Sequence, residues 1–282
     1  MGALDGRVAI VTGASRGIGA EIARRFAVEG ARVAVSARTT EAGQSAFEGT
    51  IHETVQSIVD ANGVAVAVAA NLARSEDRAR LVEETERQLG PVDILVNNGA
   101  VTWFGPVETF TEKHFRMMFE VQVRAPFELA QLVLPGMRAR QWGAILNISS
   151  KGAIHPAGPP YNGGLGGTVY GMVKAALERF TTGLAAEVHA DNVRVNVLSP
   201  TSIVPTPGVV HHNLLTPERA HLAEPVEVMA AAALALVTDP PGLTGRVAYS
   251  QQVLWELGLG PQPLDELLVG EHPRLGGVLA EE

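Results

Sequence analysis

Tyr170 and Lys174 stand four residues apart in the segment Tyr170-Gly-Met-Val-Lys174. In a helix this spacing places both side chains on one face, one turn from each other. An ammonium group beside a phenol favours the phenolate and lowers its pKa from ~10 toward neutral pH. The pair therefore predicts a proton donor and acceptor for hydroxyl or carbonyl chemistry, although the same short pattern also fits an ordinary surface pair.

A second chemical feature is the turn Thr12-Gly-Ala-Ser-Arg-Gly-Ile-Gly19, which follows an apolar run and leads into residues at helical spacing. Its three glycines let the backbone approach a ligand, and the unpaired N–H groups of a helix N-terminus favour an anion. The spacing differs from the usual G-x-G-x-x-G. By itself the turn is therefore either a nucleotide loop or a tight strand-to-helix connection.

Arg16 and Arg38 bear on which dinucleotide this turn would hold. Arg16 lies in the glycine turn, and Arg38 follows the end of a second predicted strand. An acidic residue at that strand end would bind the ribose 2′-hydroxyl, whereas arginine accommodates a 2′-phosphate. The sequence therefore favours NADP(H) over NAD(H), unless both arginines are solvated surface charges.

The glycine turn, Asn97-Asn98-Gly99-Ala100, Ser149-Ser150 and the tyrosine–lysine pair occur in an order that resembles the classical short-chain dehydrogenase/reductase family, over about residues 6–250. The resemblance implies hydride exchange between a nicotinamide and a substrate carbonyl carbon. Tyr170 would be the acid/base, Lys174 would hold the nicotinamide ribose, and Ser150 would bind the substrate oxygen. The implied cofactor-binding residues are Gly13, Ser15, Arg16, Gly17, Ile18, Gly19, Arg38, Asn71, Leu72, Asn98, Gly99, Ala100, Tyr170, Lys174, Pro200 and Ile203.

One departure from the family pattern lies between the serine and the tyrosine. The spacing from Ser150 to Tyr170 exceeds the family's usual spacing by about seven residues, which predicts an insertion within 158–167 at the mouth of the site. The tyrosine inside this segment, Tyr161, has Leu165 rather than lysine four residues later. It is therefore rejected as the acid/base.

Three further departures concern single positions. Gln122 stands where the family often has an asparagine that holds a water in the proton relay, and we count it with the catalytic residues. Thr201 follows Pro200 where glycine is common. Gln251-Gln252 and Trp255 replace the usual acidic-glycine ending. These changes affect expectations about rate and substrate more than those about fold.

The elements that position these residues follow from apolar periodicity. Seven strands are predicted at 7–11, 32–36, 64–69, 93–96, 143–148, 193–198 and 246–250. Helices are predicted from 18 to about 29, and at 51–61, 75–89, 111–140, 168–190 and 225–237. This alternation predicts an α/β fold: a single-domain, Rossmann-type, doubly wound parallel sheet of about seven strands with helices on both faces, covering residues 1–257, with a substrate loop at 201–224 and a tail at 258–282.

Local signals sharpen three of these elements. The strand 64–69 is apolar at every position, which predicts burial on both faces. Ser75 is expected to cap the following helix. The region 111–140 is expected to bend near Pro126 or to break at Pro135-Gly136.

Composition narrows the class of protein. The net charge of -8 argues against a nucleic-acid surface, the absence of cysteine excludes thiol and disulfide chemistry, and no run approaches the ~18 apolar residues of a membrane span. A cytoplasmic location is expected. No metal is expected, because the adjacent His211-His212 would face opposite ways in an extended segment, and His155 is the one histidine placed near the pocket.

The substrate is the least constrained prediction. Apolar residues in loops after strand ends predict a hydrophobic or acyl-type carbonyl substrate, although they also fit core or subunit contacts: Trp103, Phe104, Ile154, Val204, Val209, Leu214 and Leu215. A dinucleotide-binding regulator without catalysis stays an alternative, and a sugar-nucleotide epimerase is less favoured. The family resemblance implies a homotetramer or homodimer.

Overall fold

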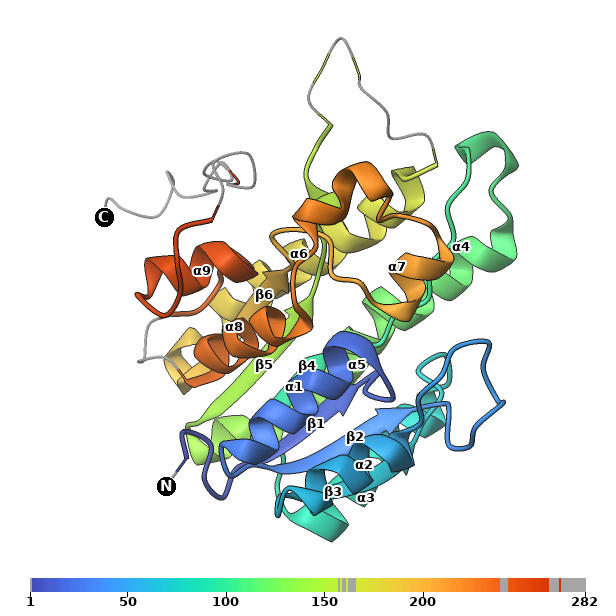
Figure 1. The fold of residues 1–282 in the computed structure, drawn as a ribbon. Coiled ribbons are helices and arrows are strands. Elements are labelled where there is room, and N and C mark those ends of the chain that lie inside the picture. The colour runs from blue at the N-terminus through green and yellow to red at the C-terminus, as the bar shows by residue number, and fades with distance from the viewer. Residues whose placement is uncertain are drawn as a thin grey trace.

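A seven-stranded parallel sheet forms the centre of the molecule, in the order β3-β2-β1-β4-β5-β6-β7 (Figure 1). The computed structural model describes residues 2–156, 158, 161, 166–238, 243–263 and 269. The strands are β1 Val8–Thr12, β2 Arg32–Ala37, β3 Val64–Ala69, β4 Ile94–Asn97, β5 Gly143–Ile148, β6 Val193–Ser199 and β7 Val247–Tyr249. The predicted single-domain, doubly wound fold is confirmed, and its strand order reverses between β1 and β4.

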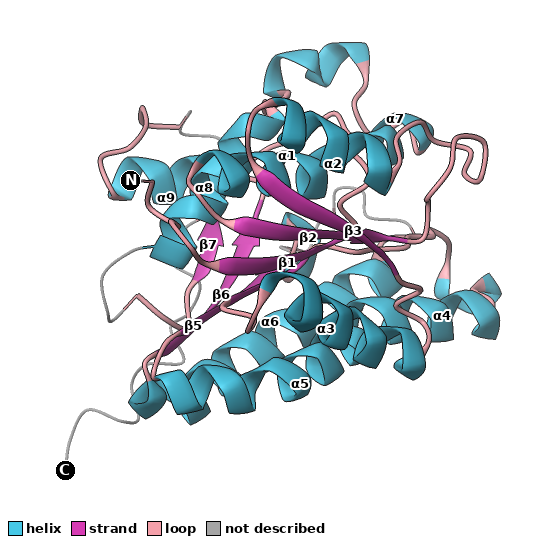
Figure 2. Cartoon of the chain, turned by 90° about the horizontal axis from the view of Figure 1, so that it is seen from below, coloured by secondary structure: helices cyan, strands magenta, loops and turns pink. Residues whose placement is uncertain are grey.

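Two layers of helices bury the sheet (Figure 2). One face carries α1 Gly17–Val28, α2 Ile51–Asp60, α8 Val226–Thr238 and α9 Ser250–Glu256, and the other carries α3 Ser75–Leu89, α5 Ala125–Arg140 and α6 Thr168–Val188. Each layer has its own core, one built on Phe26 and Met229, the other on Leu81 and Leu129. Strands between two such cores are apolar on both faces, which is why β1 and β4 consist mainly of consecutive hydrophobic residues.

The prediction that residues 64–69 are buried on both faces is wrong. In the described part of the chain β3 pairs with β2 alone and forms an edge of the sheet, and Val64 is 50% exposed. Its alternating Val-Ala sequence reflects a strand propensity without complete burial. An apolar run therefore identified the strand but not its place in the sheet.

A side-chain cap marks the start of α2 but not the start of α3. Thr50 caps α2 in a reciprocal pair with Glu53, so the predicted start at Ile51 is confirmed. Ser75, the predicted cap of α3, is instead the first helical residue, and Arg74 precedes it without a side-chain cap. The carboxylates of Glu76 and Asp77 in the first turn complement the helix dipole there.

The predicted helical region 111–140 has an irregular turn where a simple bend was expected. It consists of α4 Glu112–Phe119, a π-helical turn Glu120–Arg124, and α5. Pro126 lacks an N–H and its ring crowds the carbonyl four residues earlier, that of Gln122, so a wider turn at this point is favourable. The helix does not break at Pro135, which lies inside α5.

The predicted substrate loop 201–224 is partly helical. It contains α7 Pro207–His211 and a 3-10 turn Pro217–Leu222. Most of the predicted insertion, at 159–160 and 162–165, lies outside the described residues, as does most of the predicted tail. Within the part of the chain that is described, no helix has both the length and the apolar character that crossing a bilayer requires.

Candidate active site

A cleft of about 990 Å³ lies at the carboxyl ends of the strands, lined by the segments that follow β1 to β6. Open parallel sheets bind ligands at this edge, beside the point where the strand order reverses. Ser150 and all but one of the predicted cofactor-binding residues line it. The exception is Gly19, and the predicted catalytic residue Gln122 does not line it either.

Thr12 fixes the glycine turn to the end of β4. Its hydroxyl donates to the Val96 carbonyl at 3.1 Å and accepts from the backbone N–H groups of Asn98 at 3.0 Å and Gly99 at 3.1 Å. The side-chain amide of Asn98 donates to the carbonyls of Thr12 at 2.9 Å and Gly13 at 3.1 Å. The predicted cofactor ligand Asn98 thus uses its amide to hold the turn, a role that the sequence analysis missed.

Gly13 and Gly19 are required by the closeness of this packing. A Cβ on Gly13, which has φ of +64°, would stand 2.7 Å from the Cα of Gly99. A Cβ on Gly19 would stand 2.4 Å from the amide nitrogen of Asn98 and 2.6 Å from the Gly13 carbonyl oxygen. Gly19 therefore lets α1 begin directly behind the turn rather than forming part of the cleft wall.

Arg16 and Arg38 lie close together at one end of the cleft. Arg16 donates to the Ser45 hydroxyl at 2.9 Å and to the Gly49 carbonyl at 2.7 Å, so it also orders the loop before α2. Burial lowers the pKa of Arg16, and the nearby guanidinium of Arg38 lowers it further. Among the described residues Arg38 has no hydrogen-bond or ion-pair partner, so two mutually repelling cations face this end of the cleft.

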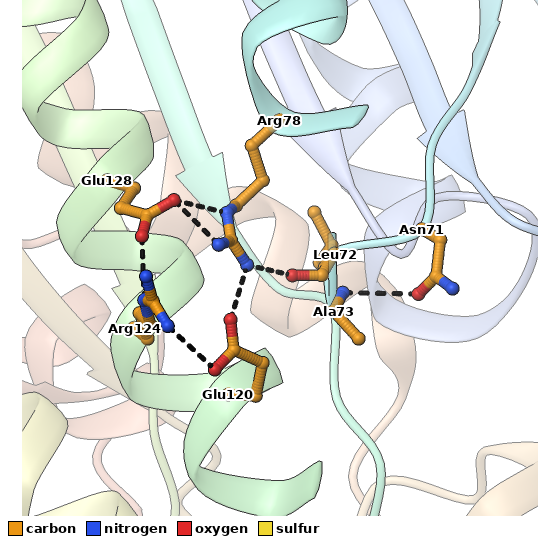
Figure 3. Close-up of polar contacts among 7 residues, drawn as sticks. All are labelled: Asn71, Leu72, Ala73, Arg78, Glu120, Arg124 and Glu128. Carbon is orange, nitrogen blue, oxygen red and sulfur yellow. Dashed lines mark hydrogen bonds and ion pairs between the residues drawn. The ribbon is translucent and has the colours of Figure 1, made fainter. Parts of the chain in front are cut away.

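Arg78 is a buried cation that the sequence analysis missed. It lies on α3, is 1% exposed, and donates to the Leu72 carbonyl at 2.5 Å, so it fixes the loop that carries Asn71 and Leu72 (Figure 3). In the same loop the Oδ1 atom of Asn71 accepts from the N–H of Ala73 at 3.1 Å, which leaves its amide N–H groups for the cleft.

Two carboxylates neutralise Arg78. Its guanidinium contacts Glu120 at 2.9 Å and Glu128 at 2.6 Å, and Arg124 binds the same two carboxylates from the outside (Figure 3). Burial raises the pKa of Glu128, but the hydrogen bonds and charges of the two arginines outweigh burial and lower it. The cluster joins α3 to the π-helical turn and α5, because its charged members come from these three elements, and Arg78 also holds the loop after β3 through the Leu72 carbonyl.

Ser150, Tyr170 and Lys174 meet at the other end of the cleft. Ser150 and Tyr170 both line this end, and the serine hydroxyl acts to lower the pKa of the phenol, although most of the intervening insertion lies outside the described residues. Lys174 lies one turn along α6, with its Nζ 5.8 Å from the centre of the Tyr170 ring and donating to the Ile148 carbonyl at 2.9 Å. Tyr161, rejected above, is 67% exposed.

The protonation of this group differs from the expectation. Burial raises the pKa of Tyr170, and the hydrogen bond from Ser150 opposes that rise in part, so the predicted lowering by Lys174 is not found. Burial also lowers the pKa of Lys174 to about 8, against the attraction of Glu178 one turn further on. Desolvation therefore dominates the pKa of Tyr170, and the phenol keeps its proton at neutral pH.

Gln122 lies beneath the cleft in the π-helical turn and is 1% exposed. Its Nε2 donates to the Val101 carbonyl at 2.7 Å, so it supports the loop after β4. Its Oε1 is buried without a hydrogen-bond donor among the described residues. The residue thus reaches the cleft wall through backbone and does not itself line the cleft.

The sequence profile described as short chain dehydrogenase matches residues 7–213. An uncharacterized oxidoreductase of Methylorubrum extorquens is 36% identical over 206 residues, which are 72% of this chain and 76% of that protein. The chain belongs to the short-chain dehydrogenase/reductase family. It is accordingly an NAD(P)-dependent oxidoreductase of that family, and the resemblance stated from its motifs is confirmed.

Solved structures of related short-chain dehydrogenases/reductases have the same fold as this chain. A metagenomic short-chain oxidoreductase in complex with NADP matches with a TM-score of 0.71 at 31% identity, over 87% of this chain and 97% of that chain. A 7α-hydroxysteroid dehydrogenase complexed with NADH and 7-oxo glycochenodeoxycholic acid matches with a TM-score of 0.76 at 30% identity, over 87% and 93%. Relatives therefore bind either nicotinamide dinucleotide. The residues of this chain fit such a group, with close-packed glycines at one end of the cleft and the guanidinium groups of Arg16 and Arg38 beside them.

The substrate side of this dehydrogenase differs from prediction in its histidines. His155, predicted near the pocket, does not line the cleft, whereas His211, the last residue of α7, and His212, the residue that follows it, do. Of the predicted apolar residues, Ile154 and Leu215 do not line the cleft. The other five do: Trp103, Phe104, Val204, Val209 and Leu214. The part of the chain that is described contains no group of three potential metal ligands.

Proposed function

We propose that this chain is an NADP(H)-dependent carbonyl reductase or secondary-alcohol dehydrogenase that acts on a hydrophobic or acyl-type substrate. The observation that carries the proposal is the placement of Ser150, Tyr170 and Lys174 together at one end of a cleft whose other end holds the glycine turn. Acid/base and oxygen-binding groups then stand where a carbonyl would approach the cofactor.

In the reducing direction the chain's residues handle the oxygen of the substrate. The bound nicotinamide would supply the hydride to the carbonyl carbon. Ser150 donates a hydrogen bond to the carbonyl oxygen, and Tyr170 gives its phenolic proton to the oxygen as negative charge develops there. Because burial raises the pKa of Tyr170, the phenol holds this proton at neutral pH.

The remaining site residues support the cofactor and the loop around it. Lys174 would bind the nicotinamide ribose through its ammonium group, and its positive charge would stabilise the phenolate left on Tyr170. Gln122 acts through the Val101 carbonyl as a positioning residue. Arg38 and Arg16 support NADP(H), since a 2′-phosphate would relieve the repulsion between their guanidinium groups.

The experiment follows NADPH and NADH oxidation with a panel of aliphatic, aromatic, steroid-like and acyl carbonyls. Tyr170→Phe is expected to abolish turnover while NADPH binds with unchanged affinity, because the phenyl ring fills the same space. Arg38→Ala is expected to weaken NADPH about tenfold or more and to leave NADH unchanged, the loss of one charged hydrogen-bond partner. Undiminished turnover by Tyr170→Phe refutes the mechanism.

Two further results would change the assignment. Binding of NADPH with no hydride transfer to any carbonyl would favour a dinucleotide-binding regulator. Equal affinity for NADPH and NADH would remove the cofactor preference but leave the reaction. The cytoplasmic location, the homodimer or homotetramer and the domain boundary at 257 stay predictions.

A further inference from the structure

Four rings form a row across the cleft, and we define this aromatic row as Phe47, His211, His212 and Phe104. Phe47 meets His211 at a centroid distance of 5.3 Å, His211 meets His212 at 5.1 Å, and His212 meets Phe104 at 5.2 Å. Each pair is close to perpendicular, between 76° and 88°. These are favourable edge-to-face contacts.

The aromatic row joins the two walls of the cleft. Phe47 comes from the loop after β2, where the Arg16 guanidinium lies 5.9 Å from its ring centre. Phe104 comes from the loop after β4, and its ring centre lies 5.5 Å from that of Tyr170. The two histidines at the end of α7 bridge them, and all four rings line the cleft.

The segment that carries the histidines is tied down at its base. The Glu224 N–H donates to the Ile203 carbonyl at 2.8 Å, and the fully buried Glu224 carboxylate accepts from the Ser202 N–H at 3.2 Å and from Gln251 Nε2 at 2.8 Å. Residues 204–222 therefore form a lobe with a fixed neck. Its histidines stand at a defined place above the catalytic end.

Phe104 and His212 are the members of the row nearest the reacting atoms. A carbonyl oxygen bound to Ser150 and Tyr170 places the group attached to the carbonyl carbon beside Phe104, whose ring contacts Tyr170 and is still 39% exposed. Burial and the neighbouring His211 lower the pKa of His212, so its imidazole is neutral at neutral pH and behaves as an aromatic wall.

We propose that Phe104 and His212 are specificity-determining residues that make the enzyme prefer carbonyl compounds with a flat aromatic ring attached directly to the carbonyl carbon. This inference rests on the proposed function and deepens it. A flat ring adds one more edge-to-face or stacked contact to the row. A puckered or flexible group of equal size fills the same apolar space without that contact.

The test compares three methyl ketones with the same number of carbon and oxygen atoms: acetophenone, cyclohexyl methyl ketone and methyl hexyl ketone. The readout is the ratio of kcat/KM for acetophenone to that for cyclohexyl methyl ketone. Because intrinsic reactivity is the same for every variant, the change in this ratio from wild type to variant reports the aromatic contact.

Phe104→Leu keeps an apolar side chain and removes the ring, and we expect it to lower the ratio about tenfold; His212→Leu is expected to lower it about threefold. The matched control is Phe127→Leu, which removes a ring of α5 that packs on Phe180 at 5.9 Å and does not line the cleft. Its ratio is expected to equal that of the wild type.

Each outcome decides the inference. Ratios that stay within twofold of wild type in both Phe104→Leu and His212→Leu overturn it, as does an equal fall in Phe127→Leu. Turnover of methyl hexyl ketone without turnover of acetophenone overturns the inference and leaves the proposed function standing. If no ketone, and no carbonyl of the wider panel, is reduced, the proposed function fails with it.

Discussion

The two ends of the cleft are built by different means. At the cofactor end, the Thr12 hydroxyl and the Asn98 amide bond directly to backbone atoms of neighbouring loops, and glycines bring those loops into contact. At the substrate end, a lobe is tied at its neck by Glu224 and reaches the walls through ring contacts. The cofactor end therefore has fixed backbone positions. At the substrate end only the base of the lobe is fixed by hydrogen bonds, and the side chains of the lobe determine the shape of the cavity.

This difference indicates which end tolerates change. Backbone packed at contact distance has no room for a methyl group, because neither side can move away without losing hydrogen bonds. Rings that meet at about 5 Å can be replaced one at a time, since the neck still holds the lobe. Cofactor binding should therefore be sensitive to small changes, and substrate preference should vary with single side chains.

The largest effect is expected from a substitution that disrupts the packing at the cofactor end. In Gly19→Ala the new Cβ would lie 2.4 Å from the Asn98 amide nitrogen, so the turn must shift. We expect about 1–3 kcal/mol of lost stability and about a hundredfold weaker NADPH binding, measured by thermal denaturation and by fluorescence titration. Gly208→Ala on α7, where a Cβ meets nothing within 4 Å, is the matched control and should change NADPH affinity less than twofold. Equal losses in both variants would contradict the contrast between the two ends.

A smaller effect is expected at the neck of the substrate lobe. Glu224→Ala removes the buried carboxylate that accepts from the Ser202 N–H and the Gln251 amide, which costs about 1–3 kcal/mol locally. The KM for the carbonyl substrate should rise about five- to tenfold, while the Kd for NADPH stays unchanged. Steady-state kinetics and cofactor titration on the same preparation check this. A rise in both constants would mean that the lobe and the cofactor end are not independent.

The smallest expected effect is a pH dependence of stability and of NADPH affinity, caused by the titration of Lys174 at the catalytic end. The pKa of Lys174, lowered to about 8, lies below its unfolded value of ~10.4, so the folded state binds fewer protons between these values. Stability from this group therefore rises with pH from about 8 to about 10, and its burial is unfavourable below that window. NADPH affinity should fall a few-fold as the ammonium deprotonates above pH 8. Titrations from pH 6.5 to 9.5 should show this fall in the wild type and not in Lys174→Met.

The sequence was sufficient to place the strands and helices, although the predicted cap at Ser75 was wrong. Strand and helix positions followed from periodicity, and the tyrosine–lysine spacing placed both groups correctly on α6. The edge position of β3 was not predictable, because a Val-Ala repeat does not say how many neighbours a strand has. The rise in the Tyr170 pKa was missed for a related reason, because burial is a property of the packed molecule and it is the main cause of that rise.

Residues that act at long range were also beyond the sequence. His211 and His212 were expected to face opposite ways in an extended segment, but they lie at the end of the short helix α7 and both line the cleft. Arg78 was not identified from the sequence. Its partners are 42 and 50 residues away along the chain, so nothing local marks it as buried.

The Arg78 cluster limits which substitutions this protein can accept one at a time during evolution. Loss of Arg78 alone would leave the carboxylates of Glu120 and Glu128 facing each other with Arg124 as their remaining partner, and loss of either glutamate would leave a buried cation undercompensated. Each single substitution is therefore destabilising, although simultaneous replacement of all three charged residues need not be. Positions 78, 120 and 128 should therefore show strong epistasis, and in an alignment of relatives they should change together rather than one by one.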